Sequence, residues 1–323
     1  MTDEINLTLN VIDHIEQYYI PIFLCLCLLG NSLSVYVLFF TKLRYNSSSI
    51  YLGTFAMSDI AVLMTIFMIW FEWRNIINYE NWLRILLFGL RWLFCFLSIW
   101  IVVAFTVQRY IAIKWPLLRR SLCTVNRAKT VMIGLVGLAV LYSIPWFILK
   151  SKDFNADKNI TNLKNWWRIF ISVNAIITLI LPVTIIVMFN TLIIYIIRKQ
   201  NRIQKNLILC SAVSDDKTRS TGNETSHIKV TKMLVIISSV FICLNVPIKV
   251  CTLCINYGIS NMYISIIFPI STFLYVINYG INFVLYCATG TNFRRELILM
   301  FTKCSDSRKN EDTEMKNFEK QCD

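Results

Sequence analysis

The chain has 323 residues, of which 56% are hydrophobic and 16% charged, and it carries a formal net charge of +13. Soluble globular domains usually carry about 25% charged residues, so the composition excludes an ordinary soluble protein and indicates a membrane protein. The charges gather between long apolar runs. The basic excess is therefore expected to set membrane topology and to attract anionic lipid, and no nucleic-acid partner is expected.

Seven apolar runs of about 20 residues predict an all-α membrane protein with a seven-helix transmembrane bundle, because a helix satisfies its own backbone inside hydrocarbon. The expected spans are Tyr18–Phe40, Ile50–Phe71, Ile85–Val107, Thr130–Leu149, Ile169–Ile197, Met233–Ile255 and Met262–Cys287. The expected regions are an extracellular N-terminus (1–17), the seven-helix domain (18–290), an amphipathic juxtamembrane helix (291–304) and a cytoplasmic tail (305–323).

The orientation follows from the placement of lysine and arginine. Residues 1–17 contain four acids and no Lys or Arg, whereas residues 108–129 contain six basic residues and no acid. We therefore expect a multi-pass protein of the plasma membrane with its N-terminus outside. Asn6 and Asn159 each begin an Asn-x-Thr triplet on the expected outer side, so they are candidate glycosylation sites.

Polar residues inside the spans are strong functional signals, because such groups are costly in hydrocarbon. Asn31 in the first span is expected to bond a neighbouring helix. Asp59 in the second span is a carboxylate at mid-membrane, which needs a cation, a proton or several donors. Ser98, Asn278 and Asn282 are further polar groups on the third and seventh spans.

The third span ends in Gln108-Arg109-Tyr110, at the predicted cytosolic border. An arginine at the edge of a span is expensive unless it has a partner or a function. The segment that follows leads to the basic pair Arg119 and Arg120, so Arg109 is expected at a helix end that faces the cytosol.

The seventh span ends in Asn282-Phe-Val-Leu-Tyr286, and Thr291–Cys304 follows it. Apolar residues recur in this second segment at helical spacing, at Phe293, Leu297 and Phe301. The pattern predicts an amphipathic helix on the inner leaflet, ending in Cys304 as a candidate palmitoylation site.

The motifs together resemble those of rhodopsin-like (class A) G-protein-coupled receptors over nearly the whole chain. They occur in the family's order: Gly30-Asn31, Ala56-Met-Ser-Asp59, Asn81-Trp82, Gln108-Arg109-Tyr110, Pro182, Phe241 with Pro247, and Asn282-Phe-Val-Leu-Tyr286. In that family the tryptophan matched by Trp82 packs against the bundle. Phe189-Asn190 and the segment 281–294 look most similar to invertebrate peptide receptors of the FMRFamide and myosuppressin kind.

The resemblance implies two intramembrane sites. A sodium ion, the one possible cofactor, is expected at Asp59, Ser98, Asn278 and Asn282. Coupling to a heterotrimeric G protein is expected to involve Gln108, Arg109, Tyr110, Asn190, Asn282 and Tyr286.

Several positions depart from the family's pattern. Gln108 replaces the acid before Arg109, and His227 stands where some relatives have a glutamate, so Arg109 lacks both carboxylates that hold it in an inactive state. Asn245 replaces the usual aromatic residue of the sixth span, and Phe283 replaces the proline of the seventh. No cysteine lies in the outer loops, so the family's loop disulfide is not available.

The outer halves of the spans are expected to line a ligand cavity. The candidates are Glu72, Arg91, Trp92, Cys95, Trp146, Lys249, Phe268 and Tyr275. Arg91 stands where amine receptors have an aspartate, which disfavours a monoamine ligand. Arg91 and Lys249 together favour an anionic or carbonyl-rich ligand group. The alternative is that Arg91 forms an internal ion pair with Glu72.

The sequence therefore predicts a cell-surface receptor, activated by a peptide and signalling through a G protein. A constitutively active or scavenger-type receptor is the first alternative, motivated by Gln108 and Asn245. A transporter or channel is the second, supported by Asp59 alone and lacking the inverted repeats of such proteins. No nucleophile, metal-ligand cluster or phosphate loop has a supporting context, so no enzymatic activity is expected.

Overall fold

The computed structural model describes residues 2–155, 160–210, 221–259 and 262–302. Within these ranges, seven helices are long and apolar enough to cross a membrane, which confirms the predicted all-α bundle. The elements are α1 (Thr2–Phe40), η1 (Lys42–Tyr45), α2 (Ser47–Trp73), α3 (Asn81–Lys114), α4 (Pro116–Leu122), α5 (Val125–Asn155), α6 (Ile160–Ala175), η2 (Ile176–Ile180), α7 (Leu181–Cys210), α8 (Thr221–Asn256) and α9 (Met262–Thr289). A further helix covers residues 291–302.

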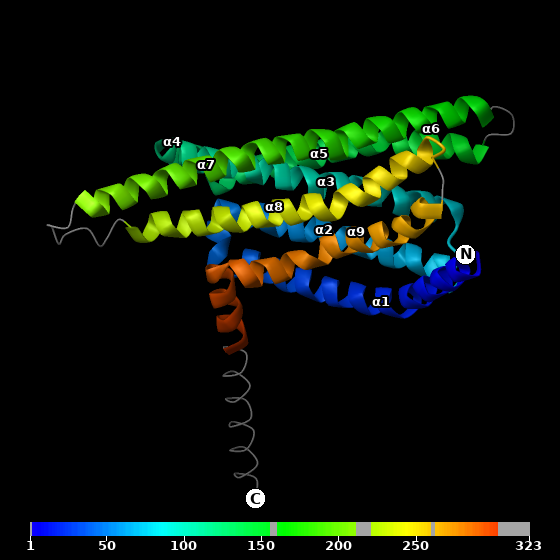
Figure 1. The fold of residues 1–323 in the computed structure, drawn as a ribbon, viewed down its shortest axis with the longest axis horizontal. Helices are drawn as coiled ribbons and strands as arrows, with labels where there is room; N and C mark the ends of the chain where they lie inside the picture. Colours follow the sequence, from blue (N-terminus) through cyan, green and yellow to red (C-terminus); the bar gives the residue numbers. More distant parts are fainter. Residues whose placement is uncertain (1, 156–159, 211–220, 260–261, 303–323) are drawn as a thin grey trace, which may run out of the picture.

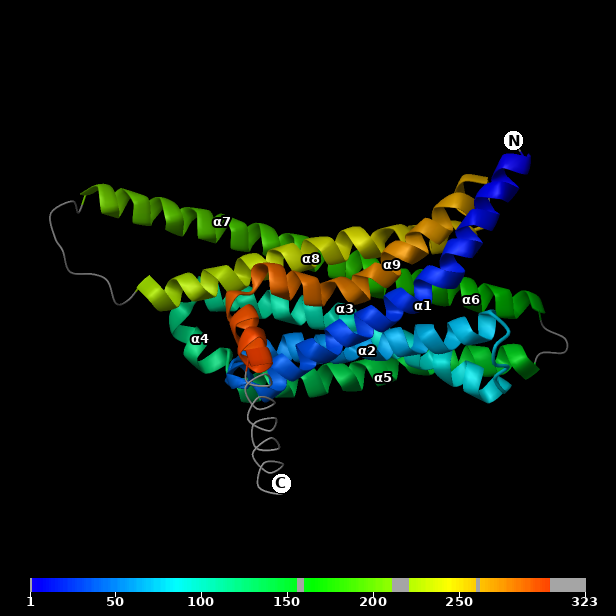
Figure 2. The same ribbon diagram turned by 90° about the horizontal axis from the view of Figure 1, so that it is seen from below.

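The long helices run side by side along one axis (Figure 1). The N-terminus and the link between α2 and α3 lie at one end of the bundle, and α4 lies at the other (Figure 2). The first is the predicted outer end and the second the predicted cytosolic end. At the cytosolic end α7 and α8 diverge from each other (Figure 2).

The helices extend beyond most of the predicted spans, because polar residues at their ends continue the same helical backbone. The outer tail expected at residues 1–17 is described from Thr2 on and forms the first turns of α1. The third span is extended at both ends, since α3 runs from Asn81 to Lys114, and the fifth is extended most, since its helical run covers residues 160–210. Trp82 on its first turn is 65% exposed, so the prediction that this tryptophan packs against the bundle is wrong.

The fifth span is one continuous helical run interrupted by a π-helical turn. This turn, η2, lies between α6 and α7, and Pro182 is the second residue of α7. A proline cannot donate a backbone hydrogen bond and crowds the preceding turn, and a wider π turn accommodates both effects.

Helix α3 passes through the centre of the main hydrophobic core, with buried side chains along most of its length. On the other side of the bundle, α1 and α9 approach closely at Gly280. A Cβ atom on Gly280 would overlap Cys27 Sγ, so the close approach of α1 and α9 depends on glycine there. Asn31, also on α1, donates from Nδ2 to the Tyr279 carbonyl at 2.7 Å, which confirms the predicted interhelical bond.

The helix over residues 291–302 turns sharply away from the bundle direction (Figure 1). Phe293 is 5% exposed and packs on Tyr286, with 5.6 Å between ring centroids. Phe301 on the same helix is 55% exposed. This distribution of apolar side chains agrees with the predicted eighth helix, one part of which anchors to the bundle while another faces outward.

Candidate functional site

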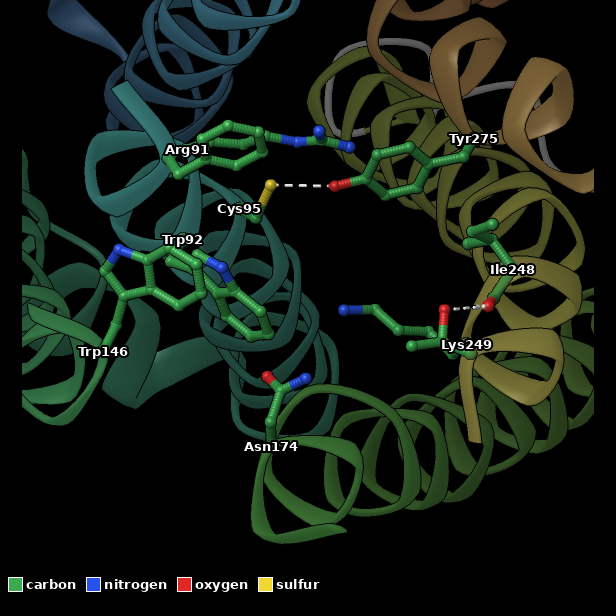
Figure 3. A pocket seen from close by; sticks show the side chains of 10 residues that line it. Arg91, Trp92, Cys95, Trp146, Asn174, Ile248, Lys249 and Tyr275 are labelled. Carbon is green, nitrogen blue, oxygen red and sulfur yellow. Dashed lines mark hydrogen bonds between the residues drawn. The ribbon is translucent and has the colours of Figure 1, made fainter. Parts of the chain in front are cut away.

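A cavity of about 330 Å³ lies between the outer halves of α3, α5, α6, α8 and α9. It is lined by Phe88, Arg91, Trp92, Cys95, Trp146, Asn174, Ile248, Lys249, Thr252 and Tyr275. Arg91, Trp92, Cys95, Trp146, Lys249 and Tyr275 were predicted here from the sequence, and the structure brings them together. Figure 3 shows their side chains around one open centre.

Two cationic side chains reach this cavity from different helices. The Arg91 guanidinium of α3 lies 5.7 Å from the centre of the Tyr275 ring, and the Lys249 ammonium of α8 lies 5.9 Å from the Trp92 ring. Aromatic faces attract cations, so both charges have partial electrostatic partners. None of the described side chains that line the cavity is a carboxylate.

Glu72 does not contribute to this cavity, and here the sequence prediction is wrong. Its carboxylate pairs with Arg84 at 2.6 Å, one turn into α3. Arg84 projects from the first turns of α3, nearer the outer end than Arg91, so it reaches the end of α2 first. The predicted ion pair between Glu72 and Arg91 is therefore not formed. Phe268 is also outside the cavity lining, with its side chain 38% exposed.

Aromatic rings form one wall of the cavity. Trp92 and Trp146 stack with their ring centroids 5.6 Å apart and their planes 25° from parallel. Phe170 packs against Trp92 at 5.3 Å, and Trp167 meets Trp146 edge-on at 5.4 Å. Offset and edge contacts of this kind hold large side chains in fixed orientations. The wall is thus preformed.

The floor of the cavity is a thiol held between two tyrosines. Cys95 Sγ lies 2.8 Å from the Tyr275 hydroxyl, and the Tyr279 hydroxyl donates to the same sulfur at 3.4 Å. The Tyr279 carbonyl accepts from Asn31, as described above. These contacts connect the cavity to α1 through buried polar atoms.

Below the cavity, the Asp59 carboxylate is fully buried and has two neutral partners. Ser98 donates from Oγ to Oδ1 at 3.0 Å, and Asn282 donates from Nδ2 to Oδ2 at 2.7 Å. Three of the four residues predicted for the sodium site therefore meet. The fourth, Asn278, contributes its backbone carbonyl to Asn282 at 3.1 Å, while its own Nδ2 is buried with no hydrogen-bond partner among the described residues.

At the cytosolic end of α3, Arg109 is 4% exposed and held by neutral groups. Its Nη2 donates to Ser48 Oγ and, at 3.4 Å, to Gln108 Oε1. Its guanidinium also lies 4.9 Å from the centre of the Phe105 ring. Gln108 in turn donates to Ser47 Oγ at 3.0 Å. No acid contacts Arg109 among the described residues, as the sequence predicted. The Gln108 amide and the Ser48 hydroxyl accept from Arg109 instead, and the Ser47 hydroxyl holds Gln108 in place.

Cys123 adds no negative charge to this region. Its Sγ donates to the Gln108 carbonyl at 3.8 Å. Burial raises the pKa of the Cys123 thiol, although the positive charges of Arg109 and Arg119 oppose this shift. The thiol is therefore neutral at physiological pH.

The other predicted coupling residues have contacts of their own, and one of them, Asn282, bonds Asp59 as described above. Tyr110 packs edge-on against Phe189 at 5.0 Å. Asn190 donates from Nδ2 to Ser238 Oγ at 2.7 Å and so joins α7 to α8. Tyr286 is fully buried, and its hydroxyl has no hydrogen-bond partner in the described part of the chain.

Sequence reasoning missed Ser47 and Ser48, the residues that hold Gln108 and Arg109. They open α2 directly after its N-cap residue Asn46. A run of serines at a helix start usually indicates capping, which hides any tertiary role. Asn174 and Tyr279 were also missed, because a single amide or hydroxyl on an apolar helix gives no sign of the direction it faces.

Some predictions lie outside the described residues or side chains. These are the glycosylation sites Asn6 and Asn159, the palmitoylation site Cys304 and the departure at His227. They stay predictions.

Comparison with known proteins places this arrangement in a family. The model of the 7 transmembrane receptor (rhodopsin family) matches residues 30–286. The chain is 31% identical over 204 residues to the B1 bradykinin receptor of Macaca fascicularis, covering 59% of this chain and 56% of that protein. It is 30% identical over 141 residues to the thyrotropin-releasing hormone receptor of Gallus gallus, covering 42% and 34%.

The aligned region thus spans little more than half of the first of these relatives and a third of the second. The family match is much broader and includes the cavity, the Asp59 cluster and the Arg109 region. The chain belongs to the rhodopsin family of seven-transmembrane receptors, and it is a multi-pass protein of the plasma membrane.

Proposed function

We propose that the protein is a cell-surface receptor that binds an extracellular peptide in the outer cavity and activates a heterotrimeric G protein at its cytosolic end. One observation carries this proposal. A single buried helix, α3, presents Arg91, Trp92 and Cys95 to the cavity and, about five turns further along, Arg109 to the cytosolic end. The relatives named for bradykinin and thyrotropin-releasing hormone support a peptide as the ligand class.

The mechanism follows from two alternative packings of one bundle. A ligand shifts such an equilibrium only when it binds one packing better than the other. Arg109 is held by neutral groups alone, and a separation of α3 from the start of α2 would release it. The ends of α7 and α8 diverge (Figure 2). A cavity of about 390 Å³ between these two helices, with Arg198 in its lining, offers space for a G-protein segment.

Asp59 is the proposed site of a sodium ion that favours the resting packing. A fully buried carboxylate with only neutral partners is costly, and a cation lowers that cost. Ser98 and Asn282 would hold the ion together with Asp59, since hydroxyl and amide oxygens are suitable ligands for a hard cation. The proposal predicts that sodium lowers basal signalling.

The test is G-protein activation in transfected cells, with a panel of peptides that includes bradykinin, thyrotropin-releasing hormone and amidated neuropeptides. Each peptide is also assayed on Arg109→Ala and on a control, Arg127→Ala, which changes an exposed arginine at the start of α5. We expect a peptide-dependent signal that Arg109→Ala abolishes and the control retains. A signal unaffected by Arg109→Ala, at equal surface expression, would contradict the proposal.

The neutral contacts of Arg109 also favour a second candidate function, a receptor with high basal activity. The same assay without peptide distinguishes them. A strong ligand-independent signal that Arg109→Ala removes supports constitutive signalling, and ligand uptake without any G-protein response supports a scavenger receptor.

A further inference from the structure

We infer that the outer cavity receives the free C-terminal carboxylate of a peptide whose last residue is aromatic. This inference rests on the proposed function, because it specifies the ligand of the same cavity. It also excludes C-terminally amidated peptides, including those of the FMRFamide kind, from this position.

The first step is the charge of the cavity. Arg91 and Lys249 reach it from α3 and α8, and the described residues that line it include no acid. The one carboxylate predicted to neutralise Arg91, that of Glu72, is already paired with Arg84. Both side chains are half-buried, and a cation partly withdrawn from water is costly without a counter-charge, so an arriving anion is stabilised by both of them.

The second step is the shape of the cationic groups. Arg91 carries a planar fork of N–H donors, which matches the two oxygens of a carboxylate, and Lys249 supplies a compact charge opposite it. Figure 3 shows the Lys249 ammonium directed into the open centre and the Arg91 guanidinium above it. A carboxamide carries no charge and offers a single acceptor oxygen, so it can satisfy one of the two cations while its N–H₂ group faces the other.

The third step is the size of the cavity. A volume of about 330 Å³ is near the lower limit of about 300 Å³ for pockets that hold small ligands. It therefore accepts the end of a peptide and not its middle. Of the two ends, the N-terminal ammonium is repelled by Arg91 and Lys249, and the C-terminal carboxylate is attracted.

The fourth step is the aromatic wall beside the two charges. Trp92 and Trp146 are stacked and held by further rings, and Phe88 completes the apolar side of the lining. A flat aromatic side chain offers the best complement to such rigid faces. The last residue of the peptide thus places its ring on this wall and its carboxylate between the two cations.

The experiment measures binding by saturation-transfer NMR on the purified full chain in lipid nanodiscs, and so needs no G-protein signal. The probes are N-acetyl-L-phenylalanine, its carboxamide, and N-acetyl-L-aspartic acid α-amide, which has a side-chain carboxylate and no ring. We expect the phenylalanine acid to bind about tenfold or more tightly than either other probe, because a charged hydrogen bond is lost or the aromatic contact is missing.

Variants then assign the preference to the two cations. Arg91→Gln and, independently, Lys249→Gln should each reduce the preference for acid over amide to about threefold or less, as expected when one charged partner is replaced by a neutral one. Lys114→Gln removes a cation at the opposite end of the same helix, outside the lining, and it should leave the preference unchanged. Thermal stability of each purified variant separates lost binding from misfolding.

Equal binding of acid and amide to the unmodified protein, or no binding of either, would overturn the inference. Tighter binding of the aspartate probe would overturn the assignment to a C-terminus. If the acid preference is present and dependent on Arg91 while no peptide activates a G protein, the cavity assignment stands and the proposed signalling function fails.

Discussion

Two arginines of the same helix, the half-buried Arg91 and the buried Arg109, have different environments. Both lack a carboxylate partner among the residues that the structure describes. Arg91 borders an open cavity, where a tyrosine ring is its nearest electrostatic partner. Arg109 is enclosed by Ser48, Gln108 and Phe105.

The difference shows what an uncompensated charge does in each setting. Next to a cavity, the missing counter-charge can be supplied from outside, so the arginine recognises a ligand. When protein groups enclose it, only a rearrangement of helices can improve its solvation, so the arginine responds to a change in packing. Four predictions would sharpen or break this comparison.

Arg91→Glu should have the largest effect. It places a carboxylate where we expect the carboxylate of the peptide, so attraction becomes repulsion. Loss of one partner of a shielded charge pair costs about 2–5 kcal/mol, so potency should fall by about thirtyfold to several thousandfold. Concentration–response curves for G-protein activation measure the shift. An unchanged half-maximal concentration would remove Arg91 from the binding site.

The second largest effect is expected for Asp59→Asn, which should abolish the influence of sodium on agonist affinity. Coupling between two sites is typically about 1–3 kcal/mol, so replacing sodium by a large organic cation should change agonist affinity by about fivefold or more in the unmodified protein. The variant should show no such change. Radioligand competition at matched ionic strength measures both. A variant that keeps its sodium sensitivity would exclude the Asp59 cluster as the ion site.

Gln108→Glu and Ser48→Ala should shift basal signalling in opposite directions. The glutamate gives Arg109 a charged acceptor and should lower basal activity by a few-fold, while the alanine removes a neutral hydrogen bond and should raise it by about fivefold. Ser49→Ala, a buried serine one position further on, is the matched control. Ligand-free G-protein activation, normalised to surface expression, provides the measurement. Changes of the same sign in both variants would disprove the inference that the neutral groups around Arg109 hold it in the resting packing.

Tyr275→Phe should have the smallest effect. It keeps the ring beside Arg91 and removes only the hydroxyl that meets Cys95, a weak thiol contact. We expect less than about a threefold loss of potency, against about tenfold for Tyr275→Ala, which also removes the ring. The same concentration–response assay compares the two. A larger loss in the phenylalanine variant would show that the hydroxyl contacts the ligand.

The sequence predicted the spans well because long apolar runs have few alternatives to a helix in hydrocarbon. It predicted helix ends less well, since polar residues at both ends of α3 continue the helix without a change in hydropathy. The π turn before Pro182 was not predicted from the sequence. Composition does not show which backbone hydrogen bonds change to accommodate a proline.

Residue types decided which groups require partners, and the tertiary structure decided which partners they have. The charges of Arg91, Lys249 and Glu72 were evident from the sequence, yet it could not distinguish an ion pair between Arg91 and Glu72 from two unrelated environments. The choice depended on Arg84, which lies nearer to Glu72 in space. Opposite charges attract, but the sequence does not show which acid and which base lie close enough in the fold to pair.

The amino-acid sequence alone determined the seven-helix class, the expected orientation in the membrane and the missing acid beside Arg109, since these follow from hydropathy, charge and the identity of single residues. Only the tertiary structure decided that Ser47 and Ser48 take the place of that acid, and that the aromatic wall and two cations enclose one cavity. The physical reason is that helix packing sets distances between side chains far apart in the chain, and such distances determine which polar groups can satisfy each other.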